Sequence, residues 1–319
     1  MKRCMRMFSS SLARKVLMVR PTEFGHSAET SKDNFFMNES GLSRKRQTQI
    51  AQNEFDGYVN KLKEAGVEVE SFDQPNPKCV DAVFPNNWFS THSHPELFPE
   101  SLLVTYPMRW PLRQLERQSK AFDFLKSRYR HHVDLAEEFE RKGLSLEGTG
   151  ALIFDLPNRK IFCALSERAD GNVLAELEKI LEKYSGKKWS SVTFGLADQE
   201  GRPFYHTNVG LAICEQFAIV ALENIPNIFE REKVRKELEE HRRLIRITPR
   251  QTSEFAGNAL ELKGSGDKNV LVLSERAFIA LENDTKEVMR QEWNLILPNL
   301  KLIEHVGGGS ARCMVAELF

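Results

Sequence analysis

The sequence has no excess of charge of either sign, because its 45 lysines and arginines match 45 aspartates and glutamates and leave a formal net charge of zero. Nucleic acids and anionic membranes attract proteins with a basic excess, so this chain is expected to bind neither. It also has no apolar run that approaches the roughly 20 residues needed to cross a bilayer. The expected partner is therefore a small molecule. The oligomeric state stays open, with a homodimer as one option.

Cysteine is scarce as well: there are five, an odd number at irregular spacing, with no CxxC pair. Such usage is typical of reduced thiols inside the cell and argues against a disulfide framework. His92 and His94 have strand spacing and His131 and His132 are adjacent, but no third ligand follows at the spacing of a zinc site. We therefore expect no metal and no cofactor, and a cytoplasmic location.

Acidic residues are missing from residues 1–15, which are basic and rich in serine, with Phe8 and Leu12 at the spacing of an amphipathic turn. This composition fits a mitochondrial transit peptide and equally a frayed basic extension. A first strand is expected from Lys15 or Val16. The chain is accordingly divided into a flexible or targeting extension, residues 1–14, and one catalytic domain, residues 15–319. The mitochondrial matrix is the alternative location.

Helical periodicity recurs about every sixty residues along the rest of the chain. The five expected helices cover residues 44–65, 113–128, 171–184, 228–243 and 285–295. Five short strands that begin at small or polar residues are expected between them, at 81–87, 148–154, 206–211, 256–260 and 310–315. The tetrapeptide at 166–169 also recurs at 274–277, each time after an apolar strand. This repetition predicts five ββαβ-like modules.

Five such modules can close around an axis, which protects the sheet edges and gathers the starts of the strands at one central site. The predicted fold is therefore α/β: a five-bladed, pseudo-symmetric β/α propeller in a single domain. A doubly wound α/β sheet is the competing fold. The glycine-rich run Gly307–Gly309 has no expected helix after it to cradle a phosphate, which disfavours that alternative.

The residues at the starts of the strands form one candidate site. They comprise a thiol, an imidazole, a carboxylate and three amides: Cys313, His206, Glu147, Asn86, Asn87 and Asn258. A thiolate can attack a carbon bonded to nitrogen and oxygen, while an imidazole moves protons and a carboxylate orients the imidazole or the substrate. Each residue alone also fits a structural role, such as core packing for a strand cysteine or a turn for an asparagine. Their joint occurrence at equivalent positions favours a catalytic site.

Seven blocks of sequence, at 16–21, 81–92, 146–150, 166–168, 205–210, 255–258 and 310–314, carry a family resemblance over nearly the whole chain. In these blocks the chain resembles the amidinotransferase, or guanidine-modifying, superfamily, whose five-bladed β/α propeller is called the pentein fold. Within it, the sequence is most similar to the citrulline-utilisation hydrolases, or citrulline ureidases. The resemblance implies Cys313 as nucleophile, His206 as general acid and base, Glu147 as the catalytic glutamate, and Arg168 as a contact for the substrate α-carboxylate.

The chain departs from the acidic pattern of that superfamily. Guanidine-binding relatives carry carboxylates where this chain has Asn87 and Gly150. A buried guanidinium without a counter-charge costs several kcal/mol, whereas amide side chains can satisfy the neutral ureido group of citrulline. Asn86, Asn87 and Asn258 are therefore expected, with Arg168, to bind the substrate.

The expected function is that of a cysteine-dependent hydrolase that cleaves a C–N bond of the citrulline ureido group through a covalent thio-intermediate. The products would be ornithine, carbon dioxide and ammonia, and the resemblance, not the residues, selects the bond that breaks. Backbone N–H groups of the loop 307–312 are expected to hold the oxyanion. Dimethylarginine dimethylaminohydrolase or arginine deiminase activity is the enzymatic alternative. A non-catalytic pentein that only binds its ligand is the alternative of another class.

Overall fold

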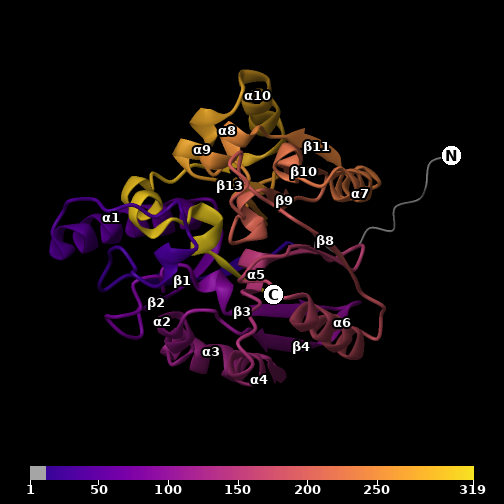
Figure 1. Cartoon of the computed structure of the whole chain (residues 1–319), viewed down its shortest axis with the longest axis horizontal. Coiled ribbons are helices and arrows are strands. Elements are labelled where there is room, and N and C mark those ends of the chain that lie inside the picture. Colours follow the sequence, from indigo (N-terminus) through magenta and orange to yellow (C-terminus); the bar gives the residue numbers. More distant parts are fainter. Residues whose placement is uncertain (1–11) are drawn as a thin grey trace.

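The computed structural model describes residues 12–319, which form a mixed α/β structure with five three-stranded sheets (Figure 1). The sheets have the strand orders β15-β1-β2, β3-β4-β5, β6-β7-β8, β11-β10-β9 and β12-β13-β14. The strands are β1 (Lys15–Arg20), β2 (Glu68–Asp73), β3 (Phe89–His94), β4 (Phe98–Thr105), β5 (His131–Asp134), β6 (Leu152–Asp155), β7 (Lys160–Ala164), β8 (Ser190–Phe194), β9 (Leu211–Ile213), β10 (Phe217–Val220), β11 (Arg243–Arg246), β12 (Leu260–Leu262), β13 (Val270–Val272), β14 (Asn294–Ile296) and β15 (Ala316–Leu318).

All five sheets repeat one pattern of pairing. The middle strand of each sheet pairs antiparallel with one neighbour and parallel with the other. Parallel neighbours require a crossover connection, and each crossover here contains a helix. The longer helices lie toward the outside of the molecule in Figure 1.

The α-helices are α1 (Arg44–Glu64), α2 (Pro111–Gln114), α3 (Lys120–Arg128), α4 (Ala136–Arg141), α5 (Gly148–Ala151), α6 (Gly171–Ser185), α7 (Ile228–Glu239), α8 (Pro249–Ser253), α9 (Glu275–Ala280) and α10 (Asn283–Glu292). The short helical turns are η1 (Thr30–Lys32), η2 (Pro85–Asn87), η3 (Leu115–Arg117), η4 (Thr207–Val209), η5 (Leu222–Asn224), η6 (Ile303–Gly307) and η7 (Ala311–Met314). No helix of the described residues is long and apolar enough to span a membrane. The expected N-terminal extension falls mostly on residues 1–11, which lie outside the described residues.

Helix α1 illustrates how local sequence produces these crossovers. Ser43 caps its first turn by accepting a hydrogen bond from the backbone N–H of Arg46. Its buried positions recur with helical spacing, at Ala51, Phe55, Tyr58, Val59 and Leu62. This apolar stripe packs in the same core cluster as β1 and the segment before β15, so the helix covers the sheet that joins the two ends of the described chain.

Helices are found in all five predicted places, but three of the predicted ranges need correction, and so do the strand predictions. The expected helix 113–128 is interrupted, because α2 and η3 end before Ser119 starts α3 as its N-cap. The helices expected at 228–243 and 285–295 run too far, because α7 ends at Glu239 and α10 at Glu292, and the last residues expected in them belong to β11 and β14. The expected strands begin too early. Residues 85–87, 148–151, 207–209 and 311–314 are short helical turns, and the strands start at Phe89, Leu152, Leu211 and Ala316, while the strand expected at 256–260 starts at Leu260. The polar residues of the candidate site therefore stand on tight turns that precede the strands.

Candidate active site

Cys313 lies on η7, buried to 2% exposure, with two amides beside its sulfur. The Nδ2 atoms of Asn258 and Asn208 lie 3.3 Å and 3.6 Å from Sγ. Burial raises the pKa of the thiol above its ordinary value, and these amides offset only part of that effect. The apolar surroundings thus keep Cys313 protonated, while the amide donors are placed to stabilise a thiolate when the proton leaves.

The glycines before Cys313 are required by close contacts. Gly308 has φ +62°, and a Cβ there would lie 2.6 Å from the Asn34 side chain. A Cβ on Gly309 would lie 2.9 Å from the ring of Phe84. Only glycine allows this backbone to pass so near its neighbours in that conformation. The loop therefore forms one wall of the site with its main chain.

His206 and Glu147 form a buried pair. The two residues have no measurable exposure, and His206 Nε2 lies 2.8 Å from Glu147 Oε2. Burial would raise the pKa of Glu147, but Arg168, His206 and Arg113 outweigh it and hold that pKa at about 2. The carboxylate is therefore ionised and accepts the Nε2 proton, which leaves the lone pair of a neutral His206 on Nδ1. Burial also lowers the pKa of His206.

The Nδ1 atom of His206, which carries the lone pair, and the side-chain oxygen of Asn87 both lie close to Gly150. A Cβ on Gly150 would lie 2.5 Å from Asn87 Oδ1 and 2.6 Å from His206 Nδ1. Neither of these two atoms has a hydrogen-bond partner among the described residues, and the same holds for Oδ1 and Nδ2 of Asn86. Because buried acceptors are normally hydrogen-bonded, these two atoms need a donor between them, and an N–H₂ group of a ligand or a water molecule can supply it.

Arg168, which the family resemblance implied, lies in the same site among charged residues that sequence reasoning did not single out. Arg168 is held by Asp33 in a two-pronged ion pair and lies 3.5 Å from Glu147. Arg113 is buried and paired with Glu116. Asp81 accepts a hydrogen bond of 2.6 Å from the hydroxyl of Thr30. Asp81 belongs to a block quoted for the family resemblance, but Asp33 and Arg113 had no motif around them to mark them.

These groups share one small cavity. Its lining includes Cys313, His206, Asn87, Arg168, Asp81 and Arg113. Its volume is about 10 Å³, which is room for about one water molecule. Glu147, Asn86 and Asn258 do not line it: Glu147 contacts the imidazole, and Asn258 contacts the thiol. A larger cavity of about 700 Å³ is lined by His92, Asp155, Arg242 and other residues, but contains neither Cys313 nor His206.

The expected oxyanion donors are only partly free. In the loop 307–312, the N–H of Gly308 is bonded to the Glu304 carbonyl and that of Arg312 to the Asn258 side chain. The N–H of Cys313 is bonded to the Ser310 carbonyl. The amides of Asn208 and Asn258 are therefore better placed than these three groups to meet charge that develops near the sulfur.

Metal-ligand clusters are not part of this site. Within residues 12–319, no group of three or more His, Cys, Asp or Glu residues is arranged to hold a metal ion. His92 instead bonds to the hydroxyl of Ser90 at 2.8 Å, and burial lowers its pKa to about 3.

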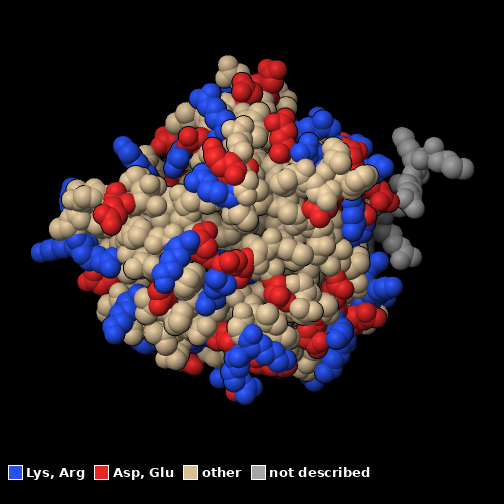
Figure 2. Space-filling model, viewed as in Figure 1, with Lys and Arg blue, Asp and Glu red and all other residues tan. Residues whose placement is uncertain are grey.

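Charged side chains of both signs are interspersed over the face seen in Figure 2, without a large area of one sign.

The environment of Cys313 predicts its response to iodoacetamide. Of the four described cysteines, all buried, only Cys313 lines the small cavity. Burial raises the pKa of Cys79 to about 11 and that of Cys163 to about 12. Because the thiol of Cys313 also has a raised pKa, its labelling should be slow at pH 7 and should rise about tenfold per pH unit up to pH 9. Peptide mass spectrometry should find Cys313 labelled first; earlier labelling of Cys163 or Cys214 would contradict this reading.

Comparison with known proteins gives matches over nearly the whole chain. Residues 20–319 match the family described as N,N dimethylarginine dimethylhydrolase, eukaryotic. No curated protein is similar enough to count as a match. Among solved structures, the N-terminal domain of the cyanobacterial arginine dihydrolase ArgZ, a mutant bound to substrate, is 17% identical with a TM-score of 0.71, and the match covers 95% of this chain and 97% of that domain.

Two further structures show how far the likeness extends. The apo structure of ArgZ, an arginine dihydrolase from the ornithine-ammonia cycle in cyanobacteria, is 17% identical with a TM-score of 0.70; 95% of this chain matches 40% of that one. A dimethylarginine dimethylaminohydrolase adduct with S-methyl-L-thiocitrulline is 14% identical with a TM-score of 0.65, and 96% of this chain matches all of that one. At these identities the structures establish a shared fold.

Proposed function

Since the chain belongs to the eukaryotic N,N dimethylarginine dimethylhydrolase family, within the pentein superfamily of hydrolases that act on C–N bonds, we propose that it hydrolyses the ureido group of citrulline. Membership of a hydrolase family favours catalysis over the non-catalytic alternative. The five repeated sheets, with β15 paired to β1, also support the proposal that they are the five blades of a closed propeller.

The neutral surroundings of the reactive groups carry the choice of substrate. Asn208 and Asn258 contact the thiol, and Asn87 faces the imidazole. The charge of Glu147, the carboxylate in contact with His206, is already compensated by Arg168. A guanidinium bound between the thiol and the imidazole would find no uncompensated carboxylate among the groups that contact these two, whereas a ureido group needs only hydrogen bonds.

The charged residues of the cavity suit an amino acid, and the cavity, now about 10 Å³, must widen to admit one. Arg113 and Arg168 can pair with an α-carboxylate, and Asp81 can pair with an α-ammonium group. Citrulline carries both groups and ends in a ureido group. Asp33 already pairs with Arg168 and Glu116 with Arg113, so binding of a carboxylate requires these arginines to exchange partners.

The reaction then proceeds in two steps. The Cys313 thiol gives its proton to Nδ1 of the neutral His206, the resulting thiolate attacks the ureido carbon, and amides beside the sulfur stabilise the tetrahedral oxyanion. The bond to the side-chain nitrogen breaks, His206 Nδ1 delivers a proton to that nitrogen, and ornithine leaves an S-carbamoyl cysteine. Water that has lost a proton to His206 attacks this thioester-like carbon and releases the thiol with carbamate, which decomposes to carbon dioxide and ammonia.

Guanidine hydrolysis is the second candidate, in the form of methylarginine or arginine hydrolysis. The family name favours it, as does Asp81, a carboxylate within the cavity that the sequence argument did not count. Incubation of the protein with citrulline, arginine and dimethylarginine, followed by mass spectrometry of the products, separates the candidates. Ornithine from citrulline supports the proposal; turnover of arginine or dimethylarginine without turnover of citrulline overturns it.

Replacement of Asn87 by aspartate should lower kcat/KM for citrulline roughly tenfold to several-hundredfold. The new carboxylate removes an amide donor and places a charge beside a neutral head group, which costs about 1–3 kcal/mol or more. Binding of arginine should improve, because its guanidinium gains a charge-assisted partner. Steady-state kinetics with both substrates provide the measurement.

Asn224→Asp is the matched control, since Asn224 is also buried but lies outside the small cavity. It should leave the ratio of kcat/KM values for citrulline and arginine unchanged. Unchanged citrulline kinetics in Asn87→Asp would remove the neutral head-group argument.

A further inference from the structure

The carboxyl group of Glu304 is buried beside the loop that leads to the nucleophile and has no part in the chemistry above. Glu304 is 1% exposed, and its Oε1 accepts a hydrogen bond of 2.5 Å from the hydroxyl of Ser310. Its Oε2 makes no hydrogen bond of good geometry among the described residues; the Arg276 guanidinium lies 4.0 Å away, and the Ser274 side chain offsets part of the rise that burial causes in the pKa of Glu304. A carboxyl group buried with so few partners costs free energy and calls for an explanation.

Glu304 is bonded at two points to the segment before Cys313. Its carbonyl accepts the N–H of Gly308 at 3.1 Å, while its side chain accepts the hydroxyl of Ser310. The carbonyl of Ser310 in turn accepts the N–H of Cys313 at 3.0 Å. A chain of hydrogen bonds therefore runs from Glu304 through Ser310 to the backbone of the proposed nucleophile.

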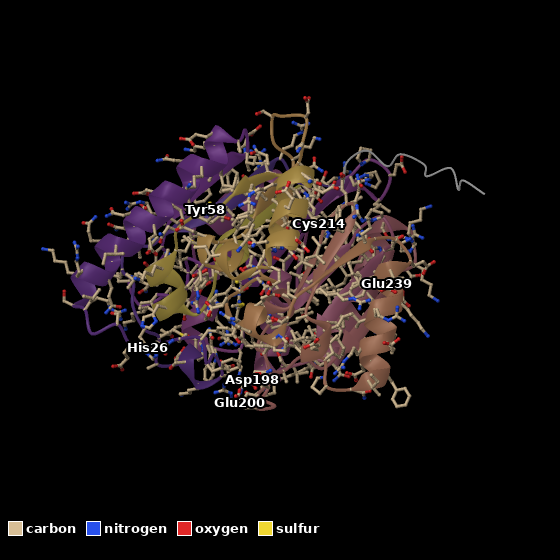
Figure 3. All side chains as sticks on the ribbon, turned by 90° about the horizontal axis from the view of Figure 1, so that it is seen from above. His26, Tyr58, Asp198, Glu200, Cys214 and Glu239 are labelled. Atoms are coloured by element: carbon tan, nitrogen blue, oxygen red, sulfur yellow. The ribbon has the colours of Figure 1, made fainter. Side chains whose placement is uncertain are left out.

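Helix α1 anchors both ends of the same segment. Glu54 accepts the N–H groups of Leu302 and Ile303 at 2.8 Å and 2.9 Å. Tyr58, one turn further along α1 and labelled in Figure 3, donates its hydroxyl to the Ala311 carbonyl at 3.2 Å. Between these two anchors lie three glycines, whose backbone is the most flexible that a chain can have. Glu304 supplies contacts from within that stretch, which Asn34 and Tyr205 also hold from outside by donating to the Gly308 carbonyl.

We propose that Glu304 is a positioning residue that fixes the glycine loop so that Cys313 is aligned with the substrate. The proposal rests on Cys313 as the nucleophile of the proposed function. A misplacement of about 1 Å at reacting atoms can cost on the order of a hundredfold in rate. A residue that acts only through alignment should change kcat far more than KM.

Replacement of Glu304 by alanine should lower kcat roughly ten- to a hundredfold and leave KM within about twofold. Glu304→Gln keeps an oxygen that accepts the Ser310 hydroxyl and should stay within about threefold of wild type. Glu254→Ala is the control, because Glu254 pairs with the same Arg276 but does not touch the loop. Kinetics are measured with whichever amino acid of the panel the wild type turns over, so a different substrate does not affect this test.

Ser310→Ala makes the proposal falsifiable even if Glu304→Ala fails to fold, because it removes the hydroxyl that Glu304 holds and should itself reduce kcat. Where Glu304→Ala folds, a double-mutant cycle follows: the variant with both alanine changes should be no slower than Glu304→Ala alone, because the two changes remove one shared bond. Strictly multiplicative losses, or an equal loss in Glu254→Ala, would overturn the proposal. A kcat of Glu304→Gln as low as that of Glu304→Ala would overturn it as well.

Discussion

Replacement of Cys313 by serine is expected to lower turnover at least about ten-thousandfold while the fold is retained, because removal of a covalent nucleophile from a site that works as a unit abolishes its chemistry. The substitution is nearly isosteric, so the amides of Asn208 and Asn258 keep a polar partner. The side chains that bond to the sulfur of Cys313 are amides and not bases, and a serine hydroxyl is far harder to deprotonate than a thiol. Single-turnover assays and circular dichroism should show a folded, inactive protein.

Cys79→Ser is the matched control for this experiment. Cys79 is also buried, and its thiol donates to the Leu112 carbonyl, a bond that a serine hydroxyl can replace. This variant should retain wild-type kinetics. Appreciable turnover in Cys313→Ser would refute the covalent mechanism, whatever the substrate.

Replacement of His206 is expected to have the second largest effect. His206→Ala removes the Nδ1 atom that exchanges protons in both steps, and loss of general acid and base catalysis typically costs 10²–10⁴-fold. Glu147 would also lose its imidazole partner and remain as a buried carboxylate beside Arg168. His206→Gln should preserve a donor to Glu147 but slow the hydrolysis of the S-carbamoyl enzyme, so intact-mass spectra after incubation with substrate should show an adduct.

His92→Gln is the comparison that isolates catalysis from burial. His92 is as deeply buried but bonds to Ser90 and lies outside the small cavity. It should retain turnover once any difference in thermal stability has been measured. Kinetics of His206→Ala close to wild type would remove this residue from the mechanism.

The sequence predicts the scaffold of the site better than its exact geometry. Helical periodicity locates α1, α6 and α7 because their apolar faces repeat regularly. The turns before the strands were read as strand because short helical turns of three or four residues have too few positions to show a period. Proline and asparagine in η2 are residues of turns as much as of strand ends, so composition alone does not decide between the two.

Contacts between residues that are far apart in the sequence were harder to predict than the helices. Asp33 and Arg168 are 135 residues apart, and nothing local to Asp33 indicates that it faces a buried guanidinium. Asn208 stands two residues after His206, and its block was noted, but only the folded chain shows its amide at the sulfur. The role of Glu304 likewise depends on its bond to Ser310, six residues along the chain, across a run of glycines whose path the sequence leaves undetermined.

The pairing of β1 with β15 has a consequence for folding kinetics. Lys15 lies opposite Leu318, so this sheet closes only when segments some three hundred residues apart have met. Such long-range contacts require the chain to lose loop-closure entropy before the contacts stabilise it, and proteins that depend on them typically fold slowly. Cys313 stands three residues before β15, whereas the elements that hold Glu147 and His206 contact one another through α5 and η4. During refolding the proton-transfer pair can thus be in place before the nucleophile arrives, and recovery of activity should report the final closure rather than the gain of secondary structure.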